Sequence, residues 1–181
     1  MTTIIGVEYS NRAVVLADSR VVGESKIYNH PDMVKVVNNG NFIIGAAGDV
    51  RALQVVLHTW KPPVPLAKDK LDLFTFMIAK IVPSLKQLLT ESGVLDSKSS
   101  DDKDSDFELQ LIIAINGQLF EIDSDFAISR NDNGYYGIGS GGDYALGALH
   151  AGISPEEAMA IAARLDSKTA EPFIIETQVK K

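Results

Sequence analysis

The sequence predicts an α+β fold in which two sheets lie between two layers of helices. Along its 181 residues the order of segments is strands, two helices, strands, two helices and a final strand. Short polar turns join successive strand segments, so neighbouring strands are expected to be antiparallel. Neither an internal repeat nor a linker divides the chain, and its length suits one domain spanning residues 1–181.

The chain opens with a predicted hairpin, TTIIGVEY and AVVLADSR around a polar turn at Ser10-Asn11. The second strand is apolar on both faces until Asp18, as in a strand inside a covered sheet. A two-residue loop would place Thr3 opposite Asp18, whereas a three-residue loop would place Thr2 opposite Arg20. Either register leaves the first residues of the chain beside the end of the second strand.

A second hairpin is predicted from MVKVV, the turn NNGN and FIIGAAG. Asn-Gly at 39–40 is a strong turn signal. A turn centred there pairs Lys35 with Ile44 and Val34 with Gly45, so Lys35 and Gly45 are expected to be neighbours on adjacent strands.

Two helices follow. Asp49 is the expected N-cap of the first, which carries apolar residues at helical spacing: Val50, Leu53, Leu57 and Trp60. The second is predicted over 69–92, with a kink at Pro83. Residues 96–106 are polar and acidic and are expected to form a loop.

The remaining segments repeat this order. FELQLIIAI, an Asn116-Gly117 turn and QLFEID form a third hairpin. YYGIG is a strand that ends in a glycine-rich bend at 139–142 and leads into a helix closed by Gly152. Ser154 and the Pro after it start a last helix that ends near Asp166, and FIIETQV is the final strand.

Composition excludes several classes of function. The formal charge of −7 argues against a nucleic-acid surface, which needs clustered Lys and Arg. The chain has no Cys, so disulfides, thiolate metal sites and a Cys nucleophile are ruled out. It shows no signal-peptide pattern and no apolar run close to the ~20 residues of a membrane span. We therefore expect a cytoplasmic protein without a membrane partner.

The amino terminus is the best candidate for chemistry. A catalytic triad with a His base is poorly supported, because none of His30, His58 and His150 lies in a glycine-rich or strand-end setting typical of a base. Removal of Met1 would expose Thr2, whose own α-amino group, with a reference pKa of ~8, can act as the base for its hydroxyl. Thr residues are also common at the start of a strand for structural reasons alone. The residues around Thr2 must therefore distinguish a catalytic role from a structural one.

Charged residues and glycines supply that context. Asp18 and Lys35 interrupt apolar strands, and such a pair beside Thr2 would lower the hydroxyl pKa; the alternative is an ion pair that only joins the hairpins. The Gly45 N–H could stabilise an oxyanion, or the run that it starts could simply be the turn before a helix. Ser140 lies among glycines, and a phosphate-binding turn there is disfavoured because no Lys-Ser/Thr follows and the helix opens with Asp143.

These segments resemble the proteasome β-subunit and HslV family of threonine peptidases over nearly the whole chain. The resemblance rests on TTIIGV, VVLADSR, MVKVV, IIGAAGD and, most specifically, GIGSGGDYALGAL. It implies a four-layer αββα sandwich, assembly into stacked homo-oligomeric rings, unfolded polypeptide as substrate, an ATP-dependent unfoldase as partner and no required cofactor.

The resemblance also assigns roles to residues. Thr2 is the nucleophile, Asp18 and Lys35 are its charge pair, and Gly45 is the oxyanion donor. Ser140, Asp166 and Thr169 organise the amine and its water, with Thr169 replacing the usual Ser. The implied specificity pocket is lined by Val21, Met33, Ile43, Ala47 and Arg51.

Two other functions remain open at this point. One is a catalytically silent ring subunit, although such subunits generally lose the Lys or the Thr that this chain keeps. The other is a related hydrolase that acts on a small amide.

Overall fold

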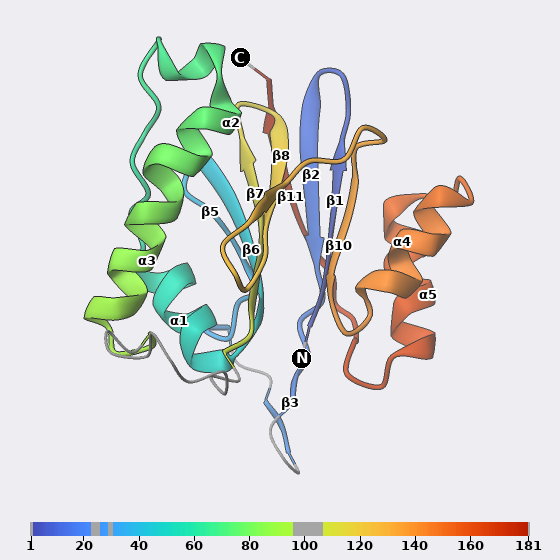
Figure 1. Cartoon of the computed structure of the whole chain (residues 1–181). Coiled ribbons are helices and arrows are strands. Elements are labelled where there is room, and N and C mark those ends of the chain that lie inside the picture. The colour runs from blue at the N-terminus through green and yellow to red at the C-terminus, as the bar shows by residue number, and fades with distance from the viewer. Residues whose placement is uncertain (1, 23–25, 29–30, 96–106, 181) are drawn as a thin grey trace.

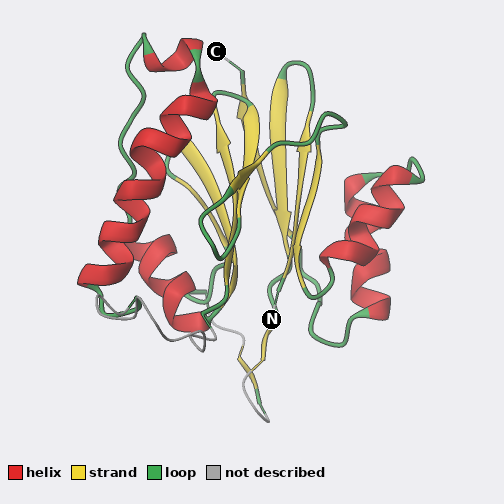
Figure 2. Cartoon of the chain, viewed as in Figure 1, coloured by secondary structure: helices red, strands yellow, loops and turns green. Residues whose placement is uncertain are grey.

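The computed structural model describes residues 2–22, 26–28, 31–95 and 107–180. Two antiparallel sheets face each other, and helices cover the outer face of each (Figures 1 and 2). This is the predicted αββα architecture. The acidic loop predicted at 96–106 lies outside the described residues.

The two sheets have four and five strands. The four-stranded sheet has the order β10 (Tyr135–Gly139), β1 (Thr3–Glu8), β2 (Arg12–Ala17), β11 (Ile174–Val179). The five-stranded sheet has the order β5 (Val36–Asn38), β6 (Phe42–Gly48), β7 (Leu109–Ile115), β8 (Gln118–Ile122), β9 (Ile128–Ser129). A short ribbon of β3 (Val21–Val22) and β4 (Ile27–Tyr28) follows the first hairpin.

Helices form the outer layers. The five-stranded sheet is covered by α1 (Val50–Thr59), α2 (Leu73–Phe76) and α3 (Val82–Glu91), and the four-stranded sheet by α4 (Gly142–His150) and α5 (Pro155–Leu165) (Figure 1). Side chains alternate along β6: Phe42, Ile44 and Ala46 face the helices, whereas Ile43 and Ala47 face the other sheet. This alternation determines which side chains of β6 can reach the site.

The first hairpin has the two-residue loop, one of the two registers that the sequence left open. Ile4 lies opposite Ala17, and the Asp18 N–H donates to the Thr3 carbonyl at 3.1 Å. The loop is short because the Tyr9 N–H bonds to the Arg12 carbonyl. Thr3 is therefore opposite Asp18, and the start of β1 lies beside the end of β2.

The register predicted for the second hairpin is wrong by two residues. Val36 lies opposite Gly45, and the Ala46 N–H donates to the Lys35 carbonyl. The loop is Gly40-Asn41, because the Asn39 side chain accepts from the N–H groups that follow it and Gly40 takes the positive φ that such turns need. A two-residue shift leaves every side chain on the same face but moves Lys35 from Ile44 to Ala46.

The helix predicted over 69–92 is interrupted twice. A 3₁₀ turn, Asp69–Leu71, ends at Asp72, whose side chain caps α2 by accepting from the Thr75 N–H at 3.0 Å. A π-helical turn, Met77–Ile81, then precedes Pro83. Pro83 lacks an N–H and crowds the preceding turn, and the wider π turn provides room for it.

Most other local signals are confirmed. Asn116 and Gly117 both have positive φ, and the Ser154 side chain caps α5 by accepting from the Glu157 N–H. Asp49 occupies the N-cap position of α1, but its side chain makes no capping hydrogen bond. Its carboxylate instead accepts from the Glu108 N–H at 3.4 Å.

Among the described residues, the stretch Leu73–Glu91 is long and apolar enough to cross a membrane by length and composition alone. The count of apolar runs in the sequence missed it. Its inward face is buried against the five-stranded sheet through Met77, Ile81, Leu85 and Leu89. This packing is that of an amphipathic helix that covers the sheet with one face.

Candidate active site

Thr2 directly precedes β1 and lines a cavity together with Gly48, at the end of β6, and Val50, at the start of α1. Only 1% of Thr2 is exposed. It lines two cavities, and Gly48 lines both of them with it. Thr2 therefore lies where a substrate in either cavity could reach it.

The predicted charge pair is formed. The Lys35 Nζ lies 2.7 Å from the Asp18 carboxylate, and both side chains are almost fully buried. The same Nζ donates to the Arg20 carbonyl. Asp18 also accepts from the backbone N–H groups of Thr3, Arg20 and Ala170 at 2.9, 3.0 and 3.3 Å. The end of β2 thus fixes the carboxylate, which in turn orients the lysine.

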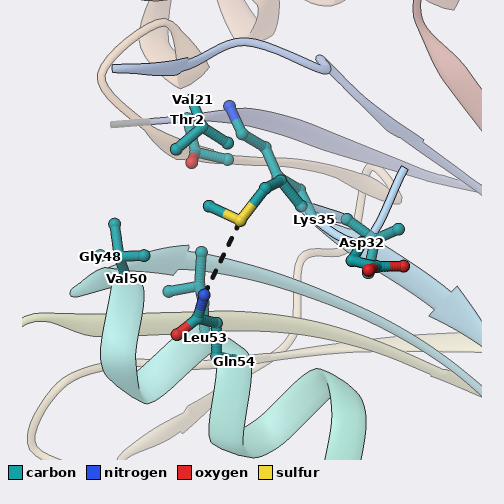
Figure 3. A pocket seen from close by; sticks show the side chains of 10 residues that line it. Thr2, Val21, Asp32, Lys35, Gly48, Val50, Leu53 and Gln54 are labelled. Carbon is teal, nitrogen blue, oxygen red and sulfur yellow. Dashed lines mark hydrogen bonds between the residues drawn. The ribbon is translucent and has the colours of Figure 1, made fainter. Parts of the chain in front are cut away.

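Lys35 directly precedes β5, and its side chain points toward Thr2 (Figure 3). Burial lowers the pKa of Lys35, and the nearby carboxylates of Asp18 and Asp166 only partly oppose this. A lysine whose pKa is lowered exchanges its proton closer to neutrality than a surface lysine does. The side chain can therefore supply either a cation or a proton acceptor beside Thr2.

A second polar cluster is centred on Asp166, at the end of α5. Its carboxylate accepts from the hydroxyls of Ser140 and Thr169, each at 2.7 Å, and from the Lys168 N–H at 3.1 Å. Burial acts to raise the pKa of Asp166, but these hydrogen bonds outweigh it and leave the pKa lowered. The Thr169 hydroxyl also contacts the Thr3 hydroxyl, which is fully buried. The sequence interpretation missed Thr3, whose only signal was its place beside Thr2.

The glycine-rich bend brings this cluster to the start of the chain. Gly139 has φ +78°, and a Cβ there would lie 2.0 Å from the Thr2 carbonyl oxygen. A Cβ on Gly141 would lie 2.1 Å from the Thr3 hydroxyl. Both positions therefore need glycine, because a side chain would displace Thr2 or Thr3.

Gly45 does not lie with the other predicted catalytic residues. A Cβ there would meet Ile4 and Val15, so the residue faces the core between the sheets. The Ala46 N–H points to β5, and by alternation the Gly45 N–H points into the ladder with β7. The prediction of Gly45 as oxyanion donor is therefore corrected.

Gly48, three residues later in the same run, fits that position better. It lines both cavities with Thr2, and the alternation directs its N–H to the side of β5, beyond that strand's first residue. Its φ of +122° and its approach to the Glu108 carbonyl, 2.1 Å from a built Cβ, exclude a side chain. Gly45 and Gly48 belong to the same small-residue run in the sequence. Only the direction of each N–H in the sheet shows that Gly48 is the better candidate for the oxyanion donor.

The structure brings two of the five predicted pocket residues into the cavity beside Thr2 and Lys35. Val21 and Met33 line it, with further lining from Asp32, Val34, Gly48, Val50, Leu53 and Gln54 (Figure 3). The Gln54 amide donates to the Met33 sulfur at 3.7 Å, which joins α1 to the opposite wall (Figure 3). We call this the apolar cavity.

The other three pocket predictions are wrong. Ile43 and Ala47 are buried between the sheets, because odd-numbered residues of β6 face that core. Arg51 is exposed and donates to the Ser92 carbonyl at 2.8 Å, away from the cavity. On α1 the face that turns to the cavity is that of Val50, Leu53 and Gln54.

Comparison with known proteins finds relatives along the whole chain. No family model matches it. A curated relative, the ATP-dependent protease subunit HslV of Sulfurihydrogenibium sp., is 28% identical over 185 residues, covering 97% of this chain and 95% of its own. HslV of Caldanaerobacter subterraneus subsp. tengcongensis is 27% identical over 154 residues, covering 81% of this chain and 76% of its own.

Solved structures share the fold. BPH of Thiobacillus denitrificans has a TM-score of 0.72 at 16% identity, covering 99% of this chain and 98% of its own. Eukaryotic HslV from Trypanosoma brucei has a TM-score of 0.61 at 23% identity, covering 97% and 98%. Anbu from Yersinia bercovieri has a TM-score of 0.65 at 16% identity, covering 98% and 81%. These structures share the fold of this chain, and the curated relatives show that it is similar to the HslV protease subunits over most of its length.

Proposed function

We propose that the chain is the proteolytic subunit of a ring peptidase and that Thr2 is its nucleophile. The observation that carries the proposal is the position of Thr2, which is buried, lines two cavities and has a fixed, buried Lys35 directed at it. A hydroxyl needs an adjacent base and a nearby positive charge to attack an amide, and this place supplies both once Met1 is removed.

The proposed reaction is acyl transfer. The Thr2 hydroxyl attacks a peptide carbonyl while its own α-amino group accepts the proton, and the Gly48 N–H stabilises the oxyanion. The amino group then protonates the departing amine, which leaves an ester on Thr2. Water hydrolyses that ester and restores the hydroxyl. Lys35 stabilises negative charge on the Thr2 oxygen throughout, and Asp18 holds it in place.

The Asp166 cluster is proposed to orient the amine and the water. With its pKa lowered, Asp166 stays ionised at working pH, so the Ser140 and Thr169 hydroxyls must donate to it. One lone pair of Thr169 then accepts from the Thr3 hydroxyl, and the remaining lone pairs of Ser140 and Thr169 are acceptors for an ammonium group or a water. Thr169 can perform this role in place of Ser, because the hydroxyl is what makes the contact.

The wider setting follows from the relatives. Both curated relatives are named ATP-dependent protease subunits, which supports a proteolytic subunit that works with an ATP-driven partner. We further propose that it assembles into homo-oligomeric stacked rings and receives unfolded polypeptide from that partner. The apolar cavity would hold the side chain on the acyl side of the cleaved bond. We place the protein in the cytoplasm, acting without a cofactor.

The test combines intact mass with hydrolysis of short fluorogenic peptides and of an unfolded protein. We expect a mass that lacks one Met, complete loss of turnover in Thr2→Ala, and partial activity in the matched variant Thr2→Ser, which keeps a hydroxyl. Full activity in Thr2→Ala would refute the proposal. Hydrolysis of small amides alone, by a particle that is not a ring, would favour a small-amide hydrolase. A processed but inert ring would favour a silent subunit.

A further inference from the structure

Thr2 also lines a second cavity, which has a volume of ≈ 410 Å³ and shares only Thr2 and Gly48 with the described lining of the apolar cavity. Apart from Thr2, Gly48 and Gly139, it is lined by polar side chains: Glu108, Gln110, Ser124 and Ser140. Among the described residues that line it, none is basic. We call it the polar cavity.

The walls of the polar cavity are fixed by hydrogen bonds. The side-chain oxygen of Gln110 accepts from the Gly139 N–H at 3.2 Å, and the side-chain amide of Gln110 donates to the Asp123 carboxylate at 3.3 Å. The Ser124 hydroxyl accepts from the Leu109 N–H at 3.1 Å. These side chains are held by the protein, so a ligand meets a preformed surface at little cost in side-chain ordering.

Glu108 gives this surface its charge. Its backbone is anchored at the end of β6, because its carbonyl accepts from the Asp49 N–H at 2.8 Å and its N–H donates to the Asp49 carboxylate at 3.4 Å. The Glu108 side chain is exposed. With Asp49 and Asp123 close by, the potential at the cavity is negative, and a cationic side chain is the complement.

Chemistry decides which part of a substrate enters. In the proposed reaction the Thr2 amino group returns its proton to the departing amine, and Ser140 with Asp166 marks the side where that amino group is held. The polar cavity includes Ser140, whereas the apolar cavity includes Lys35 and Met33. The departing half of the peptide therefore lies toward the polar cavity.

Resting on the proposed function, we infer that the polar cavity binds the side chain that follows the cleaved bond and selects Lys or Arg there through Glu108. Gln110 and Ser124 shape the cavity around the stem of that side chain. Cleavage is thus selected on both sides of the bond, by apolar contact on the acyl side and by charge on the departing side.

The test uses internally quenched peptides that differ only in the residue after the cleaved bond: Lys, norleucine or Glu. Mass analysis of the products confirms the cleaved bond. Wild type should show the order Lys, norleucine, Glu in kcat/KM, with Lys about fivefold above norleucine, as expected for a partly screened ion pair. Raising the salt concentration should shrink that ratio.

Glu108→Gln should bring the Lys-to-norleucine ratio close to one, and Glu156→Gln, on the exposed start of α5, should leave it unchanged. A wild-type ratio near one, or a ratio that survives Glu108→Gln, overturns the inference. A fluorogenic amide with a neutral leaving group separates the two levels. If Thr2→Ala abolishes its hydrolysis while the peptide ratios fail, the proposed function stands and only the role of the polar cavity falls.

Discussion

The Lys35 ammonium lies 2.7 Å from the Asp18 carboxylate, in a place where 2% of one side chain and none of the other is exposed. Removing one partner of a buried pair costs about 3 kcal/mol or more, because it leaves a charge without its partner. The two sides are not equivalent here. Asp18 keeps three backbone N–H donors if Lys35 is lost.

We therefore predict that Asp18→Asn lowers the free energy of unfolding by about 3 kcal/mol, whereas Lys35→Met lowers it less. Both variants should lose peptide hydrolysis. Urea denaturation followed by circular dichroism measures the first effect, and fluorogenic peptides the second. A Lys35→Met variant that is less stable than Asp18→Asn would show that the backbone donors do not sustain the carboxylate.

Gly139→Ala should abolish activity, because it puts a Cβ 2.0 Å from the Thr2 carbonyl at a φ of +78°. The matched control is Gly147→Ala in α4, where a built Cβ meets nothing within 4 Å. That change should raise the free energy of unfolding by about 0.5–1 kcal/mol and keep activity. Activity in Gly139→Ala comparable to that of the control would mean that the bend does not position Thr2.

Met33 is predicted to limit the apolar cavity, whose volume is only ≈ 20 Å³. Met33→Ala should enlarge it and raise the preference for Leu over Ala on the acyl side by about tenfold in kcat/KM. Ile43→Val is the control, because Ile43 lies in the core between the sheets. It should cost about 1 kcal/mol of stability and leave the preference unchanged. A change of preference in Ile43→Val alone would restore the original prediction.

Glu121 gives the stability a pH dependence. Burial between the sheets, with a smaller effect of Asp123, raises its pKa from 4.5 to about 7. The folded protein therefore keeps a proton between pH 4.5 and 7 that the unfolded chain has released, so this group's contribution to stability falls as pH rises through that window.

Glu121→Gln should remove this effect, flatten the dependence of Tm on pH across the window and raise Tm at pH values above it. Thermal unfolding at a series of pH values measures this. Glu156→Gln, a carboxylate on the exposed start of α5, should keep the wild-type slope. An unchanged slope in Glu121→Gln would assign the pH dependence to other groups.

The sequence predicted the first hairpin to within one residue, because a short polar loop between apolar strands leaves two registers, and both keep the start of the chain beside the end of the second strand. The sequence determined the register of the second hairpin less well. NNGN offers several turn positions, and two registers that differ by two residues bury the same faces. Local patterns alone could not choose between them.

The residues of the site were also predictable only in part. Thr2, Asp18, Lys35 and Ser140 were found from their residue types and their places in the predicted segments, whereas Asp166 and Thr169 came only from the resemblance. The structure brings all six around the start of β1. Gly45, Ile43 and Ala47 were misplaced because the face that a strand residue takes depends on register and sheet order. The polar cavity was not foreseen, since Glu108 and Ser140 meet only when both sheets are assembled.

The central claim is that one leading residue provides both the nucleophile and its base. A peptide β-lactone tests it directly, because ring opening by a hydroxyl leaves an acyl group on the attacked residue. Peptide mapping by mass spectrometry should find this acyl group on Thr2 of a chain that has lost Met1, and should find no adduct in Thr2→Ala. An adduct on another residue, or turnover by a chain that keeps Met1, would contradict the account.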